Sequence, residues 1–354
     1  MTKSDVRILG GGGAAIVVAG IAHFAGAPTG AQFVTAGIAL AMLAMLIGHS
    51  TEQVGHRLSA GATGVLQSAV GNLPELFVCI FALRAGLVDV VRSALVGSIL
   101  ANALLVFGVA ILAGGLKNGK QVFHSESARL TSAMLLLAVS AMVIPTLAHE
   151  LHTPADGHIE ALSGFAAALL LVCFILSIPY SLNATAPAAV TPPPAAEPPG
   201  HIWPLRRAIT VLGICGVSAA FVSEWFVSAL EPTMHTLGIS QAFAGFVIVA
   251  IAGNAVENVV GIQLAIKNKM DYAVSVVLNS SLQVALALVP VLVLLSFFIG
   301  GPVLTLVIPP LLVAGLLMTV LIVAAIVADG ETIWLEGVTL IGLYAIIAFS
   351  LWWG

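Results

Sequence analysis

The sequence predicts an all-α polytopic membrane protein with about 11 transmembrane helices, one at the N-terminus followed by two five-helix repeats of inverted topology. Three observations predict it. Of 354 residues, 60% are hydrophobic and only 8% are charged, against about 25% charged residues in soluble domains. Eleven apolar stretches are long enough to cross a bilayer. A short polar motif also occurs in both halves of the chain, in similar surroundings.

The apolar stretches define the predicted helices in chain order, since a bilayer span takes about 20 residues. They cover residues 8–26, 31–55, 62–84, 90–114, 127–148, 159–180, 206–229, 239–266, 271–299, 303–327 and 332–353. The first stretch follows a basic N-terminus but lacks a small-residue cleavage site, so it is predicted to stay as a membrane helix.

Basic residues predict the orientation of these helices. Ten of the twelve lysine and arginine residues fall in loops on the side of the N-terminus, and only Arg84 and Arg92 fall on the other side. Because basic loops stay in the cytoplasm, the N-terminus is predicted to be cytoplasmic and the C-terminus external. The expected location is a bacterial inner membrane.

A proline-rich segment separates the two halves. Residues 183–200 hold six prolines and no apolar periodicity, which is typical of an extended linker. The predicted organisation is therefore an N-terminal helix (1–30), a first repeat (31–182), a cytoplasmic linker (183–205) and a second repeat (206–354).

The polar motif Gly-Asn-x-x-Glu occupies residues 71–75 and again 253–257, and the second copy lies 182 residues after the first. The same offset aligns Ser98 with Ser280, which indicates diverged repeats. Each repeat has five helices, an odd number, so the second repeat is inverted relative to the first. Sites of inverted-repeat proteins lie near the bilayer midplane, where the repeats meet.

The motif carboxylates indicate a cation site. One ionisable side chain at the bilayer centre costs about 2.5–3.5 kcal/mol on insertion scales, so a repeated one is expected to be functional. Carboxylate, amide and hydroxyl oxygens suit Ca²⁺ better than soft transition metals. The alternative is that these groups only join helices by hydrogen bonds. The candidate ligands are Gly71, Asn72, Glu75, Ser98, Asn102, Gly253, Asn254, Glu257, Ser280, Ser281 and Gln283.

Two further acids lie near predicted membrane edges. Glu52, upstream of the first motif, shares a helical face with His49 and His56, and Glu224 lies upstream of the second motif. A histidine beside a carboxylate can pass protons near neutral pH, so these four residues are candidates for an ion or proton pathway. For the histidines, a hydrated helix end is an equally good interpretation. The external loop 149–160 is rich in histidine and acid, and a solvated loop explains it better than a cation funnel.

These motifs, with Gly-Ser-x-x-x-Asn at 97–102 and Ser-Ser-Leu-Gln at 280–283, make the chain resemble the calcium/proton exchanger family of the cation/calcium antiporter superfamily. The resemblance covers about residues 31–350. It implies that Glu75 and Glu257 bind the cation and that Glu52 and Glu224 serve the ion or proton path. The Pro-Glu pair at Pro74 and Glu75 is similar to the sequences of the sodium/calcium exchangers. The neutral side chains at residues 280–283, however, argue against sodium coupling.

The functional hypothesis is antiport, in which Ca²⁺ or a similar cation leaves the cytoplasm in exchange for protons. The alternative is a sodium-coupled exchanger, of Na⁺/Ca²⁺ or Na⁺/H⁺ type, in the same superfamily. An enzyme is not expected, because no nucleophile and base pair at membrane depth. No cofactor and no nucleic-acid partner are predicted; the expected partners are the cation, protons and lipid. The sequence leaves association into a homo-oligomer open.

Overall fold

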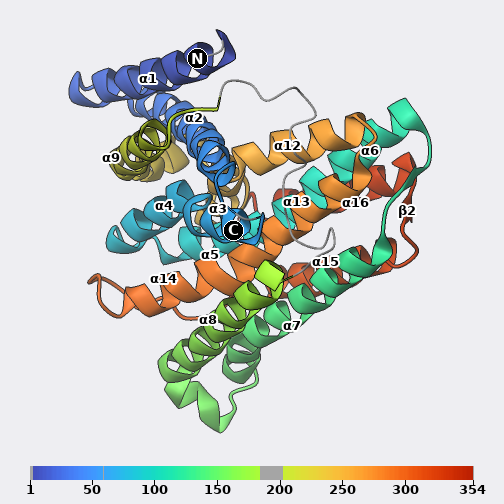
Figure 1. Ribbon diagram of the computed structural model, residues 1–354. Coiled ribbons are helices and arrows are strands. Elements are labelled where there is room, and N and C mark those ends of the chain that lie inside the picture. The colour runs from blue at the N-terminus through green and yellow to red at the C-terminus, as the bar shows by residue number, and fades with distance from the viewer. Residues whose placement is uncertain (1–2, 59, 184–201, 354) are drawn as a thin grey trace.

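The computed structural model describes residues 3–58, 60–183 and 202–353, so most of the predicted linker lies outside the described residues (Figure 1). The helices are α1 (Lys3–Phe24), α2 (Thr29–Gly55), α3 (Ala60–Val70), α4 (Leu73–Arg84), α5 (Val88–Leu100), α6 (Phe107–Asn118), α7 (Ser125–Glu150), α8 (Ile159–Asn183), α9 (Leu205–Leu237), α10 (Gln241–Phe243), α11 (Ala250–Gly253), α12 (Ala255–Ile266), α13 (Met270–Gln283), α14 (Val289–Ser296), α15 (Pro310–Ile326) and α16 (Trp334–Ser350). Three π-helical segments, η1 (Ala101–Val106), η3 (Ala244–Val249) and η4 (Val284–Leu288), lie between α-helices, and η2 (Pro154–His158) is a 3-10 helix. The strands β1 (Gln121–Val122) and β2 (Glu331–Thr332) pair antiparallel.

The molecule is a multi-pass membrane protein. Within the described ranges, seven helical stretches are long and apolar enough to cross a bilayer. An eighth is added if the helices 241–253 and 258–266, which are bent by 64°, are counted as one span. α15 and α16 are apolar but shorter. Because lipid offers no hydrogen-bond partners, helices that satisfy their own backbone are the expected solution.

Helices are interrupted at both copies of the motif, although the apolar windows 62–84 and 239–266 are continuous in sequence. α3 ends before Gly71, and α4 begins after Asn72 with Pro74 in its first turn, a position where the missing N–H of proline leaves no bond unmade. Asn254 likewise ends α11 and precedes α12. Both motif glutamates therefore lie in the first turn of a helix, where the helix dipole favours a negative charge.

Two of the π-helical segments occupy corresponding places in the two halves. η1 follows α5 and runs into α6, while η4 follows α13 and runs into α14. A π-helical turn shifts the backbone register and occurs frequently at functional sites. Asn102 lies in η1 and Gln283 directly precedes η4.

Figure 1 shows α1, α2 and α9 packed together at one end of the molecule and α7 with α8 at the other. Between them α5 crosses η3 at very short distance, because Gly245 has no side chain: a Cβ atom there would lie 2.2 Å from the Val90 carbonyl oxygen. Small residues allow such close helix contacts in membranes, where packing replaces the hydrophobic effect between helices.

Loops that the charge bias assigns to one side of the membrane meet in the fold. β1 lies between α6 and α7, β2 lies between α15 and α16, and Lys120 forms an ion pair with Glu331 across them. Nearby, the backbone N–H of His124 donates to Asp271 Oδ1 at 2.6 Å. On the assigned opposite side, Arg92 Nη2 donates to Thr305 Oγ1 at 2.7 Å.

Candidate cation site

The candidate site lies in the interior, where segments of both halves meet. Glu75 comes from α4, Ser98 from α5, Asn102 from η1, Asn254 from the break before α12, and Ser280 from α13. Each of these five residues exposes 4% of its surface or less. Burial of so many polar groups in a membrane protein indicates a functional site rather than a lipid-facing surface.

One chain of hydrogen bonds joins these five side chains. Ser98 Oγ donates to Glu75 Oε1 and accepts from Asn254 Nδ2 at 3.0 Å. Asn102 Nδ2 donates to Asn254 Oδ1 at 3.2 Å and to Ser280 Oγ at 2.9 Å. The chain crosses from the first half to the second at Ser98 and at Asn102. It therefore couples the positions of the two halves through buried polar contacts.

The second motif makes room for the glutamate of the first. A Cβ atom on Gly253 would lie 3.2 Å from Glu75 Cβ and 3.5 Å from its Cδ. Glu75 thus packs against the backbone of the other motif, which only glycine allows without displacement. The two copies of the motif are neighbours in space although 182 residues separate them in the sequence.

One buried amide oxygen of the site accepts no hydrogen bond from the described residues. Asn102 Oδ1 is buried and has no hydrogen-bond partner within the described part of the chain. Leaving a buried acceptor unmatched costs about 1–3 kcal/mol, so this atom is suited to a cation or to water. Ser281, in contrast, already uses its hydroxyl in the protein: its Oγ donates to the carbonyl oxygens of Ile99 and Val277, both at 3.3 Å.

Other predicted ligands lie at the edge of this network. Asn72 is buried next to the α4 start but makes no side-chain cap. The Gly71 N–H donates to the Gln67 carbonyl oxygen at 2.7 Å, and Gln283 is half-buried at the end of α13. The backbone of Glu257 lies in α12, while its side chain lies outside the described residues.

The predicted pathway residues lie apart from the network. His49 and Glu52 are partly buried near the end of α2, with His49 Nδ1 at 3.9 Å from Glu52 Oε2, and His56 is exposed just after the helix. Glu224 lies on the exposed side of α9. Their roles in ion or proton movement stay predictions.

Sequence reasoning missed three buried hydroxyls beside these acids. Ser223 is fully buried next to Glu224, and its Oγ donates to the Pro74 carbonyl oxygen at 3.4 Å, one residue before Glu75. Ser50 and Thr51 are buried next to Glu52, and their hydroxyl oxygens have no hydrogen-bond partner among the described residues. Their positions one or two residues before the predicted acids were the available signal.

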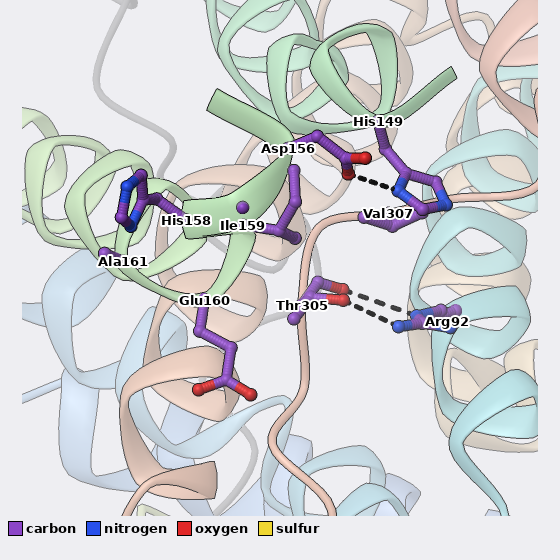
Figure 2. A pocket seen from close by; sticks show the side chains of 10 residues that line it. Arg92, His149, Asp156, His158, Ile159, Glu160, Ala161, Thr305 and Val307 are labelled. Atoms are coloured by element: carbon purple, nitrogen blue, oxygen red, sulfur yellow. Dashed lines mark hydrogen bonds and ion pairs between the residues drawn. The ribbon is translucent and has the colours of Figure 1, made fainter. Parts of the chain in front are cut away.

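The histidine-rich loop forms a separate pocket of about 700 Å³. Figure 2 shows His149 facing Asp156, with Nδ1 and Oδ1 at 2.7 Å, and Arg92 reaching Thr305. No group of three or more histidine, cysteine or acidic side chains that could hold a metal ion occurs within the part of the chain that the structure describes. The pocket contains Arg92 as well as acids, so it does not form a cation funnel of uniform charge.

A multi-pass helical protein with an oxygen-rich site between its halves has the design of a secondary transporter. The chain belongs to the sodium/calcium exchanger protein family, whose model matches residues 29–178 and 207–353.

Its similarity to calcium/proton antiporters covers nearly the whole chain. A Ca²⁺/H⁺ antiporter of Synechocystis sp. is 34% identical over 348 residues, covering 93% of this chain and 92% of that protein. The Ca²⁺/H⁺ antiporter ChaA of Bacillus subtilis is 33% identical over 339 residues and 94% of each chain. The solved structure of native YfkE, a Ca²⁺/H⁺ antiporter, superimposes with a TM-score of 0.81 at 30% identity, covering 96% of this chain and 98% of that one.

Proposed function

We propose that this protein exports Ca²⁺ from the cytoplasm in exchange for protons, by alternating access to one buried site. The observation that carries the proposal is the buried hydrogen-bond chain from Glu75 to Ser280, which joins the two motif-bearing halves. The relatives described above, which exchange Ca²⁺ for H⁺, support the choice of both ions.

The coupling follows from the charge of the site. Glu75 and Glu257 together neutralise one Ca²⁺, and the amide and hydroxyl oxygens of Asn102, Asn254, Ser98 and Ser280 complete its coordination. Ca²⁺ takes six to eight oxygen ligands in flexible geometry, and such a set meets that demand. When the cation leaves, two bare carboxylates in a buried site are unfavourable, so protons replace it before the carrier reorients.

We propose the same organisation for the chain as its sequence predicts, with eleven spans and two inverted repeats on either side of the linker. The supporting observations are the helix breaks at both motifs and the corresponding positions of η1 and η4. Ser281 also contacts the carbonyl oxygen of Ile99, which is its own counterpart at the offset of 182. Counterparts that touch each other are expected on the pseudo-two-fold axis between inverted repeats.

The proposed orientation places the N-terminus in the cytoplasm and the C-terminus outside. The meeting of the loops around Lys120, Asp271 and Glu331 supports it, because the basic-residue bias assigns all three to the cytoplasmic side. Protons are the proposed coupling ion because residues 280–283 provide no carboxylate.

The direct test is Ca²⁺ uptake into inverted membrane vesicles with an acidic lumen. Glu75→Gln and Glu257→Gln are each expected to abolish proton-driven uptake, since glutamine is the same size but cannot take up or release a proton. Glu126→Gln, an exposed acid at the start of α7, is the matched control and should transport normally. Uptake that persists in either site variant contradicts the proposed function.

A further inference from the structure

A buried polar cluster joins the N-terminal helix to the end of α2 and to the chain that follows the linker. The two carboxylate oxygens of Asp5 have different partners: Oδ1 lies 3.3 Å from His49 Nε2, and Oδ2 accepts a hydrogen bond from Trp203 Nε1 at 3.2 Å. Trp203 is fully buried, and its ring meets the His49 ring edge to face at 5.2 Å. Asp5 exposes only 5% of its surface.

The other ring nitrogen of His49 faces a second carboxylate. His49 Nδ1 lies 3.9 Å from Glu52 Oε2, so the imidazole stands between two acids. A neutral imidazole carries a hydrogen on one nitrogen only and can donate to one of them. A protonated imidazole can donate to both. The imidazole can therefore donate from Nε2 to Asp5 while Nδ1 is left to accept a proton.

Two arginines near the cluster contact Trp203. Arg57 Nη2 donates to the Trp203 carbonyl oxygen at 3.2 Å, and the Arg207 guanidinium lies over the Trp203 ring at 5.1 Å. Arg7 on α1 and His56 after α2 are exposed. Asp5 and Glu52 are the two carboxylates that lie against the His49 ring nitrogens among the described contacts.

The position of the cluster connects it to the transport site. α2 packs against α4, α11 and α12, the helices that contain or adjoin the two motifs. Ser50 and Thr51 follow His49 directly, and their buried hydroxyl oxygens have no partner among the described residues. Unmatched buried hydroxyls are places where water binds, and water can pass protons toward a histidine.

We propose that Asp5, His49 and Glu52 form a proton-accepting station on the cytoplasmic side of the antiporter, with Asp5 as a positioning residue that acts through His49. A proton released from the site toward the cytoplasm forms an N–H bond at His49 Nδ1 and then passes to cytoplasmic water, which restores the neutral imidazole. The proposal rests on the proposed function and on a cytoplasmic N-terminus. Asp5 holds the ring in place through the contact between its Oδ1 and His49 Nε2.

The test is the cytoplasmic pH dependence of transport. Inverted vesicles expose the cytoplasmic face, so the initial rate of Ca²⁺ uptake is measured against bath pH at a fixed acidic lumen. Asp5→Asn keeps the size of the side chain but removes the anion that faces His49 Nε2. The acidic limb of the rate profile is expected to move to lower pH. Asp5→Glu, which retains the charge, should keep the wild-type limb.

Two further variants complete the design. His49→Gln should lower the rate at its optimum and leave only the fall in rate that the smaller proton gradient causes at acidic bath pH. Asp156→Asn removes the charge from the matching His149 pair in the external loop and should leave the profile unchanged, because that pair does not face the cytoplasm in the proposed orientation.

A merely structural cluster gives a different result. An Asp5→Asn profile that coincides with wild type, or that is reduced equally at every pH, overturns the proton station. The outcome is separable from the main proposal, because wild-type uptake and its loss in Glu75→Gln are measured in the same vesicles. If wild-type uptake or its loss in Glu75→Gln is not observed, the antiport function is wrong. If both are observed but the acidic limb of the Asp5→Asn rate profile does not move, only the proton-accepting station is wrong.

Discussion

At the scale of single residues, Ser98 is the link between the carboxylate of one half and the amide of the other. Its hydroxyl donates to Glu75 and accepts from Asn254. Ser98→Ala removes both bonds at a buried position, and the expected loss is about 1.4 kcal/mol, or a tenfold higher Ca²⁺ concentration for half-maximal uptake. The measurement is the concentration dependence of uptake in vesicles.

The matched control for that variant is Ser140→Ala. Ser140 Oγ donates only within its own helix, to the Leu136 carbonyl oxygen at 2.7 Å, so its loss should leave the half-maximal concentration unchanged. Equal effects of the two variants would show that Ser98 has no special part in cation binding.

Gly253 offers a steric test of the contact between the two motifs. In Gly253→Ala the new methyl group would lie 3.2 Å from Glu75 Cβ, tighter than an ordinary contact, and 3.5 Å from Glu75 Cδ. We expect transport to fall at least tenfold while the protein still folds, because the displacement acts on the carboxylate itself. Uptake and thermal unfolding in detergent, measured together, separate the two effects.

Gly342→Ala is the control for this change, since a Cβ atom on Gly342 meets nothing within 4 Å. It should leave both uptake and the unfolding temperature near their wild-type values. Wild-type transport by Gly253→Ala would contradict the close packing of Glu75 on the second motif.

At the scale of elements, the segment between α6 and α7 ties the first half to the second. Gln121 is buried, and its Nε2 donates to the Ala265 carbonyl oxygen near the end of α12 at 3.0 Å. Gln121→Ala removes this bond, while Asn118 Nδ2 and the Asn268 N–H still donate to the same carbonyl oxygen. We therefore expect a loss of about 0.5–1.5 kcal/mol in unfolding free energy. Denaturant or thermal unfolding in detergent measures it.

Val122→Ala provides the comparison within the same strand, because the Val122 side chain is largely exposed. Its effect should stay within about 0.5 kcal/mol. A similar loss in both variants would indicate that the strand pairing, and not the Gln121 bond, stabilises this connection.

At the scale of the whole molecule, the proposed orientation can be tested by chemical labelling. In a Cys173→Ala background, which removes the exposed native cysteine and leaves the buried Cys79 and Cys215, Glu160→Cys and Glu331→Cys each place one exposed thiol on opposite ends of the molecule. An impermeant maleimide should label Glu160→Cys in intact cells and Glu331→Cys only after the membrane is opened. The reverse pattern would invert the proposed direction of transport.

The helical, membrane-spanning character of this protein and its family could be predicted from the sequence, because both depend on signals local to the chain. Runs of apolar residues predict which segments cross the bilayer. The repeated motif identifies the buried carboxylates even before any contact between residues is known. The helix breaks at the two motifs came from the structure, because the apolar windows 62–84 and 239–266 run through them without interruption.

Only the tertiary structure decided which polar groups meet. The bond from Asn102 to Asn254 joins residues 152 positions apart, and that from Trp203 to Asp5 joins residues 198 apart. Partners at such separations depend on how whole helices pack, and residue order alone does not specify that packing. The sequence thus determined that Glu75 and its neighbours would be buried in the membrane at a cost in free energy. The packing decided that Ser98, Asn102 and Asn254 share their hydrogen bonds, because each side chain reaches its partner only after the two halves have come together.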